Sequence, residues 1–238
     1  MKTNRQEKQD FYSDSNTVKH YEELRFSNVG GQFVHRSEER LFRQYLELCD
    51  KKDAILDIPC GTGRMFPLLL AKGFGVTHAA DYSNEMLAVC RVCPFSQSIK
   101  ISKQDIYSTT FPEQMFSVIL SSRFLFHCDD QDKLFSEYER LLMPKGYLIL
   151  DALRWSPRTW TLLFSKRLGG EIYTNSDKSI YELANDHGFE VVDSQSILIF
   201  PSYVYNFIPS FLMQPLEWVE SIWPNRLKTK TVWILKKI

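Results

Sequence analysis

The stretch Ile55–Arg64, ILDIPCGTGR, passes from apolar residues through an aspartate to two glycines with one residue between them. The apolar run before it predicts a buried strand, and RMFPLLLAKG after it predicts a helix that ends at Gly73. Gly61 and Gly63 let the backbone turn tightly and approach a ligand that a Cβ would push away, and the following helix offers free N–H groups. The stretch therefore predicts a ligand-binding turn between a strand and a helix.

The same alternation of strand and helix continues along the chain. VTHAAD predicts a second strand, and SNEMLAVCR predicts a helix capped by Ser83. Three further predicted strands are QSIKISKQD, FSVILSS and GYLILDAL, with the helix DDQDKLFSEYERLLM between the last two. Strands that alternate with helices indicate an α/β fold with a parallel sheet and right-handed crossovers.

Polar residues gather where the predicted strands end. Asp57 ends the first strand, Asp81 ends the second, and Asp105 follows the third. The fourth strand is followed by Ser122 and Arg123. Because ligands of open parallel sheets bind beyond the carboxyl ends of the strands, these residues together predict one site.

Composition excludes several classes of protein. The 238 residues carry 29 Lys plus Arg and 29 Asp plus Glu, so no overall charge favours nucleic acid. The start of the chain is polar, and no run approaches eighteen apolar residues, so we expect a cytoplasmic protein without a signal peptide or spanning helix. Five scattered cysteines favour reduced thiols, and CRVC at 90–93 has no second pair or nearby histidine to complete a metal site.

A dinucleotide site is the first alternative to test, because Asp81 stands 20 residues after Gly61, where a ribose-binding acid belongs. The dinucleotide fingerprint fails at its third glycine, since GTGRMF places Phe66 there. Asp57 also suits a cationic ligand better than a pyrophosphate. A nicotinamide-dependent oxidoreductase therefore remains only a minor alternative.

The order of five motifs resembles that of the class I S-adenosylmethionine-dependent methyltransferases, within the group that acts mostly on small molecules. The motifs are LDIPCGTGR, AADYSNEML, KQDIYS, FSVILSSRFLFHCDD and LLMPKGYLIL. Pro59 departs from the family pattern, which has a glycine there. The resemblance implies a Rossmann-like sheet of seven strands with helices on both faces, six strands parallel and one C-terminal strand, TVWILKK, antiparallel. EVVDSQSILIF would be the sixth strand.

The resemblance also implies that the residues at the strand ends hold S-adenosylmethionine. Gly61 and Gly63 would approach the methionine portion, and Asp57 would contact its ammonium. Asp81 would accept both ribose hydroxyls, a task that suits a carboxylate. The other implied contacts are Tyr82 and Met86 with the adenine ring, Asp105 and the backbone of Ile106 with its edge, Ser122 and Arg123 on the other side, and Tyr21 or Arg25 with the carboxylate.

His127 is the candidate general base, because it follows the fourth strand and can exchange a proton near neutral pH. A base is needed only when the acceptor loses a proton. The alternative is a packed histidine whose ring is hydrogen-bonded.

We expect a helical cap over residues 1–50 and a methyltransferase domain over residues 51–238. Two long insertions in that domain, at about 154–177 and 201–229, are expected to cover the acceptor. Their aromatic residues favour a small apolar or aromatic acceptor, methylated at oxygen or nitrogen. Basic residues could instead meet an acidic group of the acceptor: Arg154, Arg158, Lys166 and Arg167.

The second insertion repeats apolar residues at helical spacing, with Pro215 dividing the run. This pattern predicts a lid of two helical pieces, which could also rest on a membrane surface. A non-catalytic S-adenosylmethionine-binding protein would carry the same cofactor motifs and stays a second alternative. The sequence predicts no metal and leaves the oligomeric state open.

Overall fold

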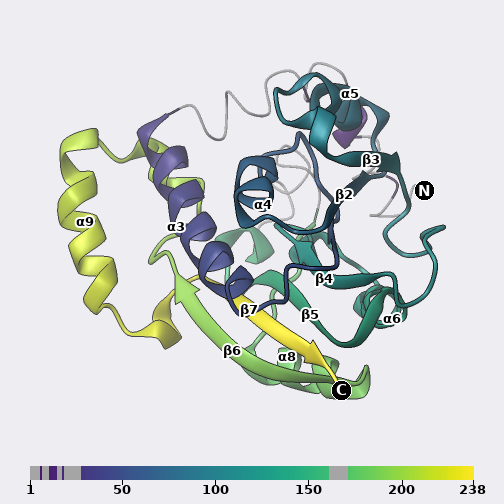
Figure 1. Cartoon of the computed structure of the whole chain (residues 1–238). Helices are drawn as coiled ribbons and strands as arrows, with labels where there is room; N and C mark the ends of the chain where they lie inside the picture. The colour runs from purple at the N-terminus through teal and green to yellow at the C-terminus, as the bar shows by residue number, and fades with distance from the viewer. Residues whose placement is uncertain (1–5, 7–10, 15–17, 19–27, 161–170) are drawn as a thin grey trace.

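Seven strands form a single sheet in the order β3-β2-β1-β4-β5-β7-β6 (Figure 1). The strands are β1 (Ala54–Asp57), β2 (Val76–Asp81), β3 (Lys100–Lys103), β4 (Phe116–Ser121), β5 (Leu142–Leu153), β6 (Phe189–Ile197) and β7 (Lys230–Lys237). Strand β7 runs antiparallel to both of its neighbours, and the other six strands are parallel to one another. The predicted Rossmann-like sheet is confirmed. This computed structural model describes residues 6, 11–14, 18, 28–160 and 171–238.

Helices cover both faces of the sheet. The described α-helices are α3 (Val29–Leu46), α4 (Phe66–Lys72), α5 (Asn84–Val92), α6 (Gln131–Leu141), α8 (Asp177–Asp186) and α9 (Ser210–Ile222). Short 3-10 turns join them: η1 (Ser96–Ser98), η2 (Leu125–His127), η3 (Pro157–Trp160), η5 (Val204–Phe207) and η6 (Asn225–Leu227). Apolar residues of α3 and α4 pack on one face of the sheet, and those of α6 and α8 pack on the other.

Local signals in the sequence explain where these helices begin and end. The Ser83 hydroxyl accepts a hydrogen bond from the Met86 N–H at 3.0 Å, which caps α5. Gly73 ends α4 in the left-handed conformation, with φ of 72°, which glycine adopts without strain. Both ends agree with the sequence prediction.

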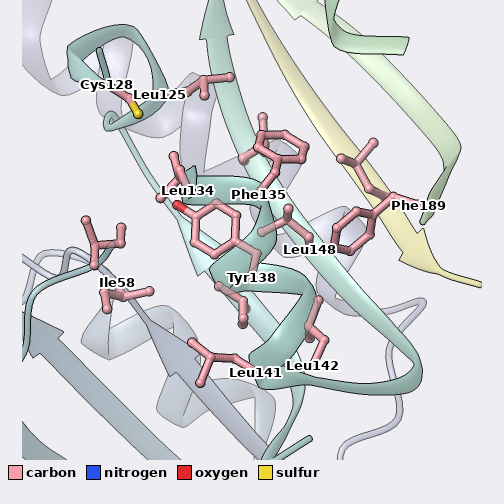
Figure 2. Packing of buried hydrophobic residues seen from close by; sticks show 14 of the residues in the cluster. Ile58, Leu125, Cys128, Leu134, Phe135, Tyr138, Leu141, Leu142, Leu148 and Phe189 are labelled. Carbon is pink, nitrogen blue, oxygen red and sulfur yellow. The ribbon is translucent and has the colours of Figure 1, made fainter. Parts of the chain in front are cut away.

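The core beneath α6 fixes the end of β4. Figure 2 shows Leu134, Phe135 and Tyr138 pointing from α6 into a cluster of buried side chains. The Tyr138 hydroxyl donates a hydrogen bond to Ser121 Oγ at 2.7 Å, and both groups are buried. Because Ser121 is the last residue of β4, this bond holds the point from which the chain turns to Ser122 and Arg123.

The C-terminal insertion differs from its prediction in one respect. Pro215 does not divide the run, because it lies inside the single 13-residue helix α9. A proline inside a helix removes one backbone hydrogen bond, here the bond that would reach the carbonyl of Phe211. Since Pro215 and Phe211 are both exposed, water can satisfy that carbonyl and the helix continues.

Candidate functional site

A cavity lies at the carboxyl ends of β1, β2 and β4. Its lining contains most of the site residues predicted from the sequence: Asp57, Gly61, Asp81, Tyr82, Met86, Asp105, Ile106, Ser122, Arg123 and His127. Gly63 is next to the lining in sequence but does not belong to it. Tyr21 and Arg25 lie outside the described residues. The parallel topology therefore brings residues from four separate loops to one place.

The glycine turn provides a cradle of backbone. Gly61 and Gly63 have φ of 55° and 86°, the left-handed region that favours glycine. A Cβ on Gly63 would lie 2.8 Å from the Phe66 ring, whereas a Cβ on Gly61 would have no neighbour within 4 Å. Gly63 therefore serves the turn itself, while Gly61 leaves open space beside the cavity.

Asp81 is fixed by backbone donors on both sides. Its Oδ2 accepts from the Gly61 N–H and its Oδ1 accepts from the Ser83 N–H, each at 2.9 Å. Burial raises the pKa of Asp81, and these backbone hydrogen bonds oppose the rise. A carboxylate has about four acceptor sites, so Asp81 keeps acceptor capacity for a hydroxyl donor of a ligand.

Asp57 is a buried carboxyl group beside the same cavity. Burial raises its pKa to about 8; the positive charge of Arg64 opposes this rise, and the negative charge of Asp81 adds to it. Within the described part of the chain, no side chain or backbone group donates a hydrogen bond to it. A cationic ligand would supply the missing counter-charge and would favour the ionised form.

Asp105 is the third carboxylate in the cavity lining. Asp105 Oδ1 accepts from the Tyr107 N–H at 3.1 Å, which orients the loop after β3. The buried side chains of Met86 and Ile106 provide apolar walls, and the half-exposed ring of Tyr82 lies at the rim. Apolar side chains beside an oriented carboxylate suit a flat heterocycle that carries an amino group.

His127 faces a tyrosine that the sequence analysis did not identify. Tyr12 Oη lies 3.4 Å from His127 Nε2, and their rings meet edge to face with centroids 5.9 Å apart. The Tyr12 carbonyl also accepts from the Ser83 hydroxyl at 2.7 Å, which ties this N-terminal segment to the start of α5. Both rings line the cavity. Nothing in the polar stretch around Tyr12 marks it as a site residue.

A buried cluster of charges adjoins the cavity; it consists of Glu38, Arg64, Arg123, Asp151 and Lys230 and is called the Glu38 cluster below. Arg123 Nε donates to both oxygens of Glu38 at 3.0 Å, and Lys230 Nζ donates to Oε1 at 2.6 Å. Arg64 Nη1 lies 3.2 Å from the second oxygen. Burial alone would raise the pKa of Glu38, but Arg123, Lys230 and Arg64 hold it below its ordinary value.

Arg123 therefore lines the cavity as predicted, but its guanidinium is bound by Glu38 of α3. Its backbone has φ of 59°, and its N–H donates to Asp151 Oδ1 at 2.5 Å. Asp151 also pairs with Lys230. The sequence analysis missed Glu38, Arg64, Asp151 and Lys230 as partners, because they come from four distant segments and no local pattern joins them.

The described structure does not test the predicted roles of the two insertions. Residues 201–229 are not in the cavity lining, so their acceptor-covering role stays a prediction. Part of the first insertion, residues 161–170, lies outside the described residues. In the ranges that the structure describes, no three His, Cys, Asp or Glu side chains are grouped as metal ligands.

Comparison with known proteins points to one domain type. Residues 56–150 match the family model described as "Methyltransferase domain". The chain is 28% identical over 173 residues to phosphoethanolamine N-methyltransferase 1 of Arabidopsis thaliana, a match that covers 70% of this chain and 35% of that protein. The chain thus spans about a third of that relative's length.

Solved structures share the fold at low identity. Phosphoethanolamine N-methyltransferase 2 of Haemonchus contortus, in complex with phosphomonomethylethanolamine and S-adenosylhomocysteine, superimposes with a TM-score of 0.68. That match has 19% identity and covers 100% of this chain and 60% of the other. The cyclase SpnF superimposes with a TM-score of 0.70 at 16% identity, covering 99% and 97% of the two chains. The shared fold by itself therefore does not fix the reaction.

Proposed function

We propose that this chain, which carries a methyltransferase domain over residues 56–150 and the class I S-adenosylmethionine-dependent methyltransferase fold, transfers a methyl group to a small acceptor. Nitrogen and oxygen are the favoured acceptor atoms. The observation that carries the proposal is the placement of three carboxylates, from the ends of three consecutive strands, around one cavity beside the glycine turn.

The described residues fit S-adenosylmethionine group by group. The Asp57 carboxyl group has no donor from the described residues and would hold the ammonium. Asp81, fixed by two backbone N–H groups, would accept the ribose hydroxyls. Met86 and Ile106 would contact the adenine, with Asp105 at its edge. When bound, the cofactor supplies a methyl group that its sulfonium already activates.

The acceptor end of the site is expected near His127. Tyr12, Phe124 and His127 form an aromatic part of the lining, which suits a small acceptor with an apolar portion. The names of the Arabidopsis relatives favour an amine acceptor, and phosphoethanolamine is therefore the first compound to assay. His127 Nε2 can take the proton that an ammonium or a phenol loses.

A non-catalytic S-adenosylmethionine-binding protein is the second candidate. The likeness to the cyclase SpnF keeps it open, because that structure has the same fold and a name that describes a reaction other than methyl transfer, so the fold alone does not require methyl transfer. Both candidates require cofactor binding, and only the first predicts S-adenosylhomocysteine as a product. Turnover with a panel of amines and phenols separates them.

Asp81→Asn tests the cofactor site directly. We expect the wild-type protein to bind S-adenosylhomocysteine with micromolar affinity, and the variant to bind about 10- to 150-fold more weakly, since a charge-assisted hydrogen bond contributes about 1.5–3 kcal/mol. Isothermal titration calorimetry measures both values. Asp53→Asn, an exposed aspartate just before β1, is the matched control and should bind like wild type. No binding by the wild-type protein, or equal binding by a folded Asp81→Asn, would contradict the proposal.

The pH dependence of binding tests Asp57. Since burial raises its pKa to about 8 in the ligand-free protein, its carboxyl group is neutral at lower pH and must lose a proton to hold a cation. Affinity for S-adenosylhomocysteine should therefore rise with pH, by up to about tenfold per unit between about pH 6 and 8, and then level off. Asp57→Asn should bind weakly with a flat profile. A wild-type profile that is flat over this window would argue against ammonium binding by Asp57.

A further inference from the structure

Helix α9 presents apolar side chains to solvent along one side. Phe211, Trp218 and Ile222 are 75%, 65% and 63% exposed, and their spacing of seven and four residues places them on the same face of the helix. Phe207, 83% exposed, precedes the helix, and Leu227 follows it, half exposed. We call these five side chains the α9 face. A helix at the surface of a globular protein normally turns its polar side outward.

The opposite side of this segment is anchored, so the orientation of α9 is fixed. Met213 and Glu220 are buried, and the Tyr205 hydroxyl donates to the Glu220 carboxylate. The Tyr205 ring stacks on Phe33 of α3 with centroids 5.4 Å apart. Gly30 permits this approach, because a Cβ there would lie 1.9 Å from the Tyr205 carbonyl oxygen. Rotating α9 to hide the α9 face would expose Met213 and Glu220 and break the hydrogen bond between Tyr205 and Glu220.

Basic residues lie on and near the α9 segment. Figure 1 shows α9 beside α3 at the edge of the molecule, and the exposed Arg36 and Arg40 are one turn apart on α3. Burial lowers the pKa of Lys228, Glu220 opposes this, and Arg40 adds to the lowering, so Arg40 lies near the end of the α9 segment. Arg226 is exposed there too. Within 201–229 the acidic residues are Glu217 and the buried Glu220.

We propose that the α9 face rests on an anionic lipid surface, with the aromatic side chains at the boundary between headgroups and acyl chains and the arginines against lipid phosphates. Interfacial helices combine aromatic residues on one face with Lys and Arg on the flanks. Among the described residues, no helix has the length and apolarity to cross a bilayer. With 13 residues, α9 is also shorter than the roughly 20 residues that a membrane-spanning helix needs.

Vesicle sedimentation of the full chain tests this proposal. We expect the protein to bind vesicles of equal parts phosphatidylcholine and phosphatidylglycerol, to bind pure phosphatidylcholine more weakly, and to be released by salt. The double variant Phe211→Ser/Trp218→Ser should lower the partition constant by about tenfold or more. Arg36→Glu/Arg40→Glu should lower the partition constant on the mixed vesicles only, by about fivefold or more for each arginine replaced.

Val92→Ser/Phe95→Ser is the matched control, since both residues are exposed and lie at the end of α5, away from α9 (Figure 1). Wild-type partitioning by this control, with loss in the α9 variant, supports the proposal. Absence of vesicle binding by the wild-type protein, or equal loss in the control, overturns it. Light scattering measures the oligomeric state of both proteins. If the wild-type protein is a dimer and Phe211→Ser/Trp218→Ser is a monomer, the α9 face binds a second copy of the chain, and the lipid proposal is overturned.

Discussion

Glu38→Gln is expected to lower the free energy of unfolding by about 3–5 kcal/mol, because it removes the carboxylate that three buried cations share. Arg64 and Arg123 are largely buried, and Lys230 and Glu38 are fully so. The amide of glutamine can still accept a hydrogen bond, but it cannot offset the charges. Asp151 would be the remaining carboxylate of the Glu38 cluster. Urea denaturation measures the change.

Glu39→Gln is the control for this experiment. Glu39 is the next residue of α3 and pairs with Arg43 at the surface, at 2.5 Å. Because exposed ion pairs contribute little, that variant should stay within about 1 kcal/mol of wild type. If Glu38→Gln and Glu39→Gln lost the same small amount, the Glu38 cluster would have no special role in stability.

The same carboxylate predicts how stability depends on pH. The cations hold the pKa of Glu38 below its ordinary value in the folded protein. An acid with a lowered folded pKa stabilises the protein above its unfolded pKa, about 4.3, and this stabilisation is lost as the pH falls below that value. The difference in stability between wild type and Glu38→Gln should therefore shrink in acid.

Sequence patterns predicted the sheet because each strand and helix carries its own local signal. The glycine turn, the Ser83 cap and the end of α4 at Gly73 depend on neighbouring residues only, and the structure confirms all three. The carboxylates at the strand ends could also be placed together, since parallel strands present their carboxyl ends to the same edge. The position and direction of β7 came from the family resemblance, since no local pattern specifies them.

Contacts between distant segments could not be predicted in the same way. The Glu38 cluster joins α3, the glycine turn, the loop after β4, β5 and β7, and of its five residues only Arg123 carried a signal in the sequence. Tyr12 reaches His127 across 115 residues of sequence. The prediction that Pro215 divides the helical run was wrong, because the rule that proline breaks a helix assumes that the freed carbonyl has no other partner. Solvent exposure, which decides this, is a tertiary property.

His127→Ala should lower the turnover number by about 100-fold or more and leave the affinity for S-adenosylhomocysteine near wild type, if His127 Nε2 takes the acceptor's proton. The ring lies in the cavity lining, as a base requires, and the Tyr12 hydroxyl 3.4 Å from Nε2 is a contact that a packed histidine would also have, so the rate of turnover decides between the two roles. Turnover is measured as S-adenosylhomocysteine formation with the best acceptor of the amine and phenol panel, beginning with phosphoethanolamine.

The pH profile separates a base from a residue that only shapes the site. A histidine base makes the wild-type rate fall on the acid side, where the imidazole is protonated, and His127→Ala should lack that limb. Tyr12→Phe keeps the ring contact and removes only the hydroxyl, so it should lower the rate less than His127→Ala while the acidic limb persists. If His127→Ala kept both the rate and the acidic limb, the proton would leave by another route and the histidine would be structural. The hydrogen bond from the Ser83 hydroxyl to the Tyr12 carbonyl would then still join the start of α5 to the segment that faces His127.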